Sequence, residues 1–119
     1  MTISPSQAGT GIAKDSKHFE TPVIRRGDVT VYAARRDKGG LTVPVEVVNS
    51  GRKRAFYRIR IRITGPGGFD ATASTSMDAV GLYPGTAWPT ELTMSDPGHT
   101  PPARPRITIE SVERTEYRA

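Results

Sequence analysis

The chain has 119 residues and a net charge of +5, from 17 Lys and Arg against 12 Asp and Glu. This length is about that of one ordinary domain, and the 12 Gly and 10 Pro favour short segments joined by turns over long helices. The sequence contains no cysteine, which excludes a disulfide scaffold, a thiolate metal site and a cysteine nucleophile.

Continuous apolar stretches in this sequence all fall short of the roughly 20 residues that a membrane-spanning helix needs. The first thirty residues also contain no apolar run that resembles a signal sequence. We therefore expect a protein without a membrane span that works in the cytoplasm, or an exported one if a leader has been removed.

The N-terminal residues 1–27 are rich in small and polar side chains and show no sustained hydrophobic period, a composition typical of an arm or linker. We predict a flexible N-terminal arm over residues 1–27, followed by one folded domain over residues 28–119. The end of the arm carries three apolar residues that we expect to touch the domain: Phe19, Val23 and Ile24. Residues 1–22 should be dispensable for folding, because they offer too little apolar area to offset the entropy of ordering them.

From residue 28 onward, apolar and polar residues alternate, as in half-buried β-strands. The pattern predicts a hairpin from segments 29–33 and 41–47, and Pro44 must then face a sheet edge or a bulge because it has no N–H to donate. Further strands are expected over residues 55–64, 69–77, 88–94 and 106–117, with a bulge near Ser111 where the period of two is broken. Short strands with frequent turns are typical of an all-β protein, here a single antiparallel immunoglobulin-like β-sandwich.

The strand over residues 55–64 carries most of the excess positive charge. Residues 52–62 hold six basic residues and no acidic one, which leaves 11 basic against 12 acidic residues in the rest of the chain. Alternate side chains of a strand point to opposite faces, so one face is predicted to enter the core: Tyr57, Ile59, Ile61 and Ile63. The other face is our candidate partner-binding surface: Arg54, Phe56, Arg58, Arg60 and Arg62.

This basic face has three interpretations. Acidic residues such as Glu46, Glu110 and Glu113 can pair with the arginines across strands and leave an ordinary solvated surface. An acidic or mixed-charge protein surface also fits, since interfaces favour Arg over Lys. Nucleic acid is the other candidate partner, because alternate arginines ~6.6 Å apart approach the phosphate spacing and Phe56 offers a stacking platform.

A protein partner is the interpretation we favour for this face, in a non-catalytic module of unknown oligomeric state, with nucleic acid as the alternative. A third function class is a structural subunit of an assembly, joined through the arm or through an edge strand at residues 41–48 that adds to a neighbouring sheet.

Catalytic and cofactor-binding residues are not expected. The two histidines are His18 and His99, and the run from Ser95 to His99 holds the letters of a catalytic triad. Neighbours in one loop cannot adopt the nucleophile–base–orienter geometry, whereas Asp-Pro-Gly is typical of a turn. No third or fourth metal ligand accompanies His18 and Glu20, or Asp96 and His99. We expect Tyr57 and Trp88 to be core aromatics.

Three segments carry a resemblance to a known group: VPVEVVNSGRKRAFYRIRIRI at 43–63, LYPGTAW at 82–88 and RITIESVER at 106–114. They resemble the small immunoglobulin-like modules common in actinobacterial proteins, including those of the FxLYD type, although no exported leader precedes them in this sequence. The matching residues are Asn49, Tyr57, Pro84-Gly85, Trp88 and Val112-Glu113-Arg114. The resemblance implies the sandwich fold and non-enzymatic binding.

Overall fold

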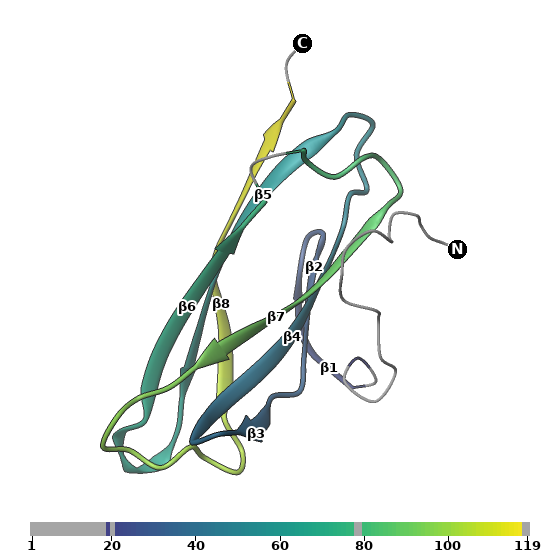
Figure 1. Cartoon of the computed structure of the whole chain (residues 1–119). Helices are drawn as coiled ribbons and strands as arrows, with labels where there is room; N and C mark the ends of the chain where they lie inside the picture. Colours follow the sequence, from purple (N-terminus) through teal and green to yellow (C-terminus); the bar gives the residue numbers. More distant parts are fainter. Residues whose placement is uncertain (1–18, 20, 78–79, 118–119) are drawn as a thin grey trace.

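The computed structural model describes residue 19, residues 21–77 and residues 80–117. Within these residues the chain forms antiparallel β-strands and a single 3₁₀ turn, η1 (Pro66–Gly68), so the predicted all-β sandwich is confirmed (Figure 1). One sheet has five strands: β1 (Pro22–Arg26), β2 (Val29–Tyr32), β3 (Arg35–Asp37), β4 (Gly40–Val48) and β7 (Ala87–Met94). The other has three, in the order β6 (Asp70–Ser76), β5 (Ala55–Thr64) and β8 (Arg106–Glu116).

The core lies between the two sheets and follows the period of two on β5. Tyr57 retains 2% of its accessible surface, and Ile59, Ile61 and Ile63 retain none. From the five-stranded sheet they meet the apolar face of β4: Leu41, Val43, Val45 and Val47. Each such side chain contributes roughly 1.5–3 kcal/mol by leaving water, and a slip of one residue would place arginines in the core instead. The predicted inward face of β5 is therefore confirmed.

The strand β4 occupies the interior of its sheet. It pairs with β2 and β3 on one side and with β7 along its whole length on the other. The predicted edge strand at residues 41–48 is thus wrong, because alternation reports which side chains are buried and not how many neighbours a strand has.

Pro44 fits this interior position without breaking a ladder. The N–H of Val48 donates to the Asp28 carbonyl at 2.9 Å, so the even-numbered residues of β4 direct their backbone groups toward β2. Pro44 falls opposite Tyr32, where β2 ends. The missing donor therefore faces the break between β2 and β3, and not an outer edge or a bulge.

The first strand begins earlier than the predicted domain boundary at Asp28. β1 pairs with β2, with an irregularity between Pro22 and Ile24, and Ile24 packs against the core. Phe19 is buried and meets the Tyr32 ring edge-on at 5.2 Å. The folded unit thus includes Phe19 and Pro22–Arg26, while residues 1–18 of the expected arm lie outside the described residues. Backbone pairing with β2 orders this short segment in spite of its weak local pattern.

The bulge predicted near Ser111 is present in β8. Arg60 pairs with Ser111, whereas the next residue of β5, Ile61, pairs with Ile109. Glu110 is therefore the extra residue of the bulge, and its side chain points to the outer face beside the arginines.

Candidate binding surface

The five residues of the predicted binding face fall into two groups in the structure. Arg58, Arg60 and Arg62 are exposed on the outer face of β5, as expected, whereas Arg54 and Phe56 at its start are half-buried. The two groups have different surroundings, which decide how much positive charge each presents.

The three strand arginines are paired with carboxylates of the neighbouring strands. The nitrogen–oxygen distances are 3.7 Å from Arg58 to Glu113, 3.0 Å from Arg60 to Glu110 and 2.6 Å from Arg62 to Asp70. Hydrogen bonds from Arg62 lower the pKa of the Asp70 carboxyl, so this acid stays ionised beside its partner. Acidic and basic groups therefore alternate along this face, and its net positive charge is small.

Two of the acids expected as partners, Glu110 and Glu113, take that role. Glu46 does not, because it lies on β4 in the other sheet, where its carboxylate accepts a hydrogen bond from the Tyr32 hydroxyl at 3.3 Å. Asp70 on β6 is the partner that the sequence pattern did not identify.

The start of β5 carries a cluster of one cation and three aromatic rings, which we call the aromatic end: Arg54, Phe56, Tyr83 and Tyr117. The Arg54 guanidinium carbon lies 3.6 Å from the centroid of the Tyr117 ring and 5.0 Å from that of Tyr83, and its Nη1 donates to the Tyr83 hydroxyl at 2.6 Å. The Phe56 and Tyr117 ring centroids are 6.2 Å apart. Cation–π contacts of this kind hold an arginine in place while leaving aromatic surface exposed.

Tyr83 and Tyr117 remain 54% and 44% exposed, respectively. Neither was identified from the sequence, although Tyr117 follows the period of two in β8 on the side of Phe56. The Tyr117 N–H donates to the Arg54 carbonyl at 2.7 Å. The register between β5 and β8 therefore places these two residues opposite each other, and knowledge of that register would have identified Tyr117.

The loop that carries Tyr83 is fixed directly to the start of β5. Leu82 and Ala55 exchange backbone hydrogen bonds at 2.7 and 3.0 Å. Gly81 has φ +83°, and a Cβ there would lie 3.1 Å from the Ala55 carbonyl oxygen and 3.2 Å from Arg54 Cγ. The glycine thus permits a close approach that places Tyr83 against Arg54.

A buried asparagine holds the adjoining turn. Asn49 has no accessible surface, and its Nδ2 donates to the carbonyls of Lys53 and Leu82 at 2.8 and 2.7 Å. Its Oδ1 accepts from the Gly51 N–H at 2.9 Å and from Arg114 Nη2 at 3.1 Å. Because both donors and both acceptors are used, this side chain ties together the two loops that flank the aromatic end.

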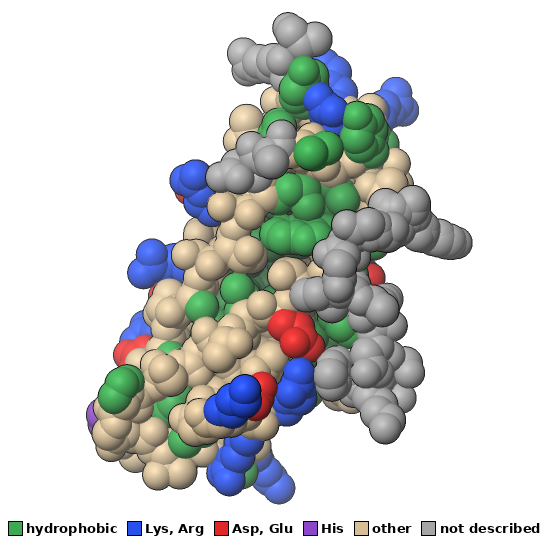
Figure 2. Space-filling model, in the orientation of Figure 1, with side chains coloured by type: hydrophobic (Ala, Val, Ile, Leu, Met, Phe, Trp, Pro, Cys, Tyr) green, Lys and Arg blue, Asp and Glu red, His purple; other side chains and the backbone are tan. Residues whose placement is uncertain are grey.

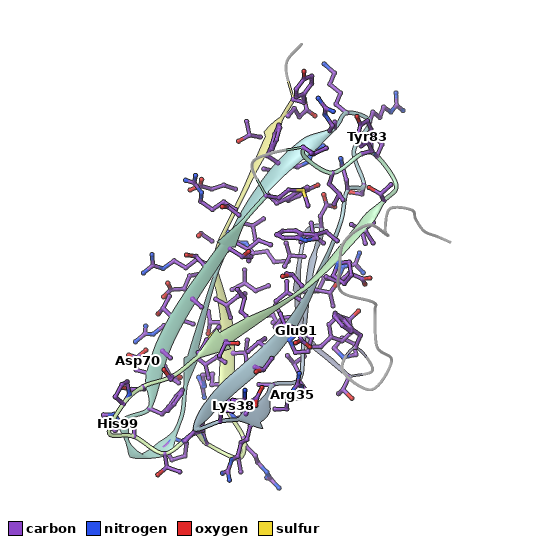
Figure 3. The ribbon with its side chains drawn as sticks, in the orientation of Figure 1. Arg35, Lys38, Asp70, Tyr83, Glu91 and His99 are labelled. Atoms are coloured by element: carbon purple, nitrogen blue, oxygen red, sulfur yellow. The ribbon has the colours of Figure 1, made fainter. Side chains whose placement is uncertain are left out.

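Arg52 and Lys53 project from this turn into solvent. In the part of the chain that the structure describes, neither forms an ion pair. Figure 2 shows Lys and Arg side chains next to hydrophobic ones at the upper end of the molecule, where Figure 3 labels Tyr83. A hollow of about 150 Å³, partly lined by Phe56 and Arg58, lies beside it. The exposed cations of Arg52 and Lys53 therefore lie beside the aromatic end.

A polar network joins the two sheets behind this surface. The Tyr57 hydroxyl donates to Asp28 Oδ2 at 2.6 Å and accepts from Arg114 Nε at 3.2 Å. Burial and the hydrogen bond to Asp28 raise the pKa of Tyr57 to about 12. Burial opposes ionisation of Asp28, yet hydrogen bonds from Ser50 and Tyr57 lower the pKa of its carboxyl overall. Tyr57 is thus a core residue as predicted, and the network has a structural role.

The segment from Ser95 to His99 forms the predicted turn. The His99 N–H donates to the Asp96 carbonyl at 3.0 Å, and the His99 ring Nδ1 lies 3.1 Å from Asp96 Oδ2. That same carboxylate oxygen accepts the backbone N–H of Asp70 at 2.9 Å, so it caps the start of β6. Figure 3 shows Asp70 and His99 at the lower end. The described residues contain no group of three side chains suited to a metal ion.

Comparisons with known proteins give no match to a family model, to a curated protein or to a solved structure. Among the described residues, no helix has the length and apolar character required to cross a membrane.

Proposed function

We propose that this protein is a non-catalytic interaction module that docks on an acidic or mixed-charge protein surface through its aromatic end. The observation that carries the proposal is Arg54 held against two half-exposed tyrosines, beside the exposed cations of Arg52 and Lys53. Tyr and Arg are the residue types in which interface energy concentrates, and rim cations increase the rate and selectivity of association with acidic surfaces.

A nucleic-acid partner is less well supported by the outer face of β5. The carboxylates of Asp70, Glu110 and Glu113 lie among the three strand arginines, and they would repel phosphates along the row that was expected to bind them. The aromatic end is also a compact cluster, whereas a single strand requires a groove with several stacking positions.

The proposal is tested by fluorescence anisotropy with two labelled probes, a random copolymer of glutamate and tyrosine and an oligo-dT strand. Replacing Arg52 and Lys53 with Gln should weaken copolymer binding about tenfold. The matched control replaces Arg58 and Arg60 with Gln, which removes the same charge from the paired row and should weaken binding less than about threefold. Tyr83→Ala should weaken binding as much as the double replacement of Arg52 and Lys53.

Equal losses from the two double variants would contradict the proposal, since binding would then follow total charge and not the aromatic end. Tighter binding of oligo-dT, with a steep fall in affinity as salt is added, would favour the nucleic-acid alternative.

A further inference from the structure

The strand β6 forms one end of the three-stranded sheet and has an unpaired backbone edge. Phe69 O accepts from the Gly65 N–H, and the Met77 N–H donates to Tyr57 O, so the odd-numbered residues between them bond to β5. In an antiparallel ladder the intervening residues point their N–H and C=O groups the other way. Thr72, Ser74 and Ser76 therefore direct these groups away from the sheet.

Asp70 provides independent support for this orientation. Its N–H also points away from β5 and is capped by Asp96 Oδ2 at 2.9 Å. No comparable backbone bond satisfies Thr72, Ser74 or Ser76 within the described part of the chain, and all three are exposed. In Figure 1, β6 runs along one margin of the molecule. A row of free donors and acceptors is thus open to solvent.

The other edges among the described strands carry features that hinder pairing with another sheet. β1 has Pro22 and an irregular register, and β7 has Pro89 in the middle of its length. In β8, Arg26 Nη1 donates to the carbonyls of Ile109 and Glu110 at 3.3 and 3.4 Å, next to the bulge. β3 is three residues long.

β6 has none of these features between Ala71 and Ser76. Its sequence there is Ala-Thr-Ala-Ser-Thr-Ser, without Pro, Lys or Arg, and its register against β5 is regular. Small side chains on both faces allow close approach of another strand.

We propose that β6 pairs antiparallel with β6 of a second copy of this chain, about a two-fold axis at Ser74. In that register Ser74 opposes its own copy and Thr72 opposes Ser76, so the three free residues form three pairs with about six backbone hydrogen bonds. The capped Asp70 is left undisturbed. The three-stranded sheets then join into one continuous sheet across the dimer.

Charge and packing favour a second copy as the occupant of this edge. Between Thr72 and Ser76, no charged side chain opposes another in the register centred on Ser74. The nearest facing arginines, Arg60 of each copy, stand three strand spacings or ~14 Å apart, which exceeds the ~8–10 Å screening length at physiological salt. On the inner face, Ala73, Thr75 and Met77 are only partly buried, and the symmetry-related strand would cover them.

The test is sedimentation of the full chain over a range of concentrations, in which the mass should rise from 12.9 kDa toward twice that value. Ser74→Lys places two ammonium groups opposite each other and should raise the dimer dissociation constant about tenfold or more. Ser74→Asp should act in the same way, and an equimolar mixture of the two variants should restore pairing. Ser74→Thr is the control, because it keeps the backbone and the neutral hydroxyl.

Amide exchange locates the contact. The N–H groups of Thr72, Ser74 and Ser76 should exchange quickly in the dilute protein and become protected as the dimer forms. A chain that stays monomeric at all concentrations would overturn the proposal, as would a dimer that Ser74→Lys leaves intact. Protection of these amides by an acidic or other foreign peptide, without self-association, would show that the edge takes a different occupant and would also refute the dimer.

Discussion

The hydroxyl of Tyr57 provides a sharp test of how the two sheets are held together. Tyr57→Phe removes one oxygen atom from a side chain that is 2% exposed and leaves the ring packing of β5 intact. It breaks the 2.6 Å hydrogen bond to Asp28 and the 3.2 Å bond from Arg114. The change therefore isolates the polar link between the β1–β2 turn and the three-stranded sheet.

The strength of the broken hydrogen bond gives the magnitude. A hydrogen bond to a charged partner contributes about 1.5–3 kcal/mol. The raised pKa of Tyr57 keeps its hydroxyl protonated, so it can donate to Asp28 at neutral pH. We expect Tyr57→Phe to lower the free energy of unfolding by about 2 kcal/mol, and the melting temperature by roughly 10 °C for a domain of this size.

The assay is urea unfolding followed by the fluorescence of Trp88, the single tryptophan of the chain. Tyr117→Phe is the matched control: it also removes one hydroxyl, which forms no hydrogen bond to the described residues, and it should change stability by less than about 0.5 kcal/mol. Equal effects of the two variants, or a loss below about 0.5 kcal/mol for Tyr57→Phe, would refute this account of the network.

The same network predicts a dependence on pH. The pKa of Asp28 is lowered in the folded state. The ionised Asp28 therefore stabilises the fold at pH values above its unfolded-state pKa of about 3.9, and this stabilisation is lost as pH falls through its folded-state pKa. Tyr57→Phe removes one cause of the lowering, and the difference in unfolding free energy between variant and wild type should narrow as pH falls through the folded-state pKa of Asp28. A gap that is the same at neutral and acid pH would show that Asp28 is not the relevant partner.

Three further experiments test other parts of the structure. Replacing Arg58 and Arg60 with Gln should cost less than about 1 kcal/mol per ion pair in urea unfolding, because both pairs are exposed; a larger loss would show that the pairs are structural. A chain that begins at Gly27 loses β1 and should be destabilised by about 3 kcal/mol or more. A chain that begins at Phe19 keeps β1 and should melt within a few degrees of the full chain. Similar melting temperatures for the two truncated chains would show that β1 contributes little to stability. Asn49→Asp places a carboxylate against two backbone carbonyls and should cost at least about 3 kcal/mol, and a stable, unchanged variant would refute the assignment of its amide.

Local patterns in the sequence were sufficient to predict a strand and its two faces where buried and exposed residues alternate along it. Ala55–Thr64 was predicted with its bounds and faces, since five consecutive switches between Ile and Arg permit one register. The bulge beside Ser111 was also predicted, because the extra residue changes the period within β8 itself. Both features depend on residues that are neighbours in the chain.

Features that depend on pairing between distant segments were missed. The interior position of β4 follows from its contact with β7, some forty residues later in the chain, and the order of β1 follows from β2. The aromatic end escaped notice for the same reason, since Arg54, Tyr83 and Tyr117 come from three separate segments. The neutralising role of Asp70 likewise required the β5–β6 register.

The claim that the aromatic end is the docking surface is tested most directly by ¹H–¹⁵N correlation spectra of the full chain during titration with the glutamate–tyrosine copolymer. We predict that the amides of residues 52–56, Tyr83 and Tyr117 shift together with one dissociation constant, and that Arg54→Gln abolishes these shifts. Shifts confined to Arg58, Arg60 and Arg62 on the outer face of β5, or unchanged shifts in the Arg54 variant, would contradict the claim.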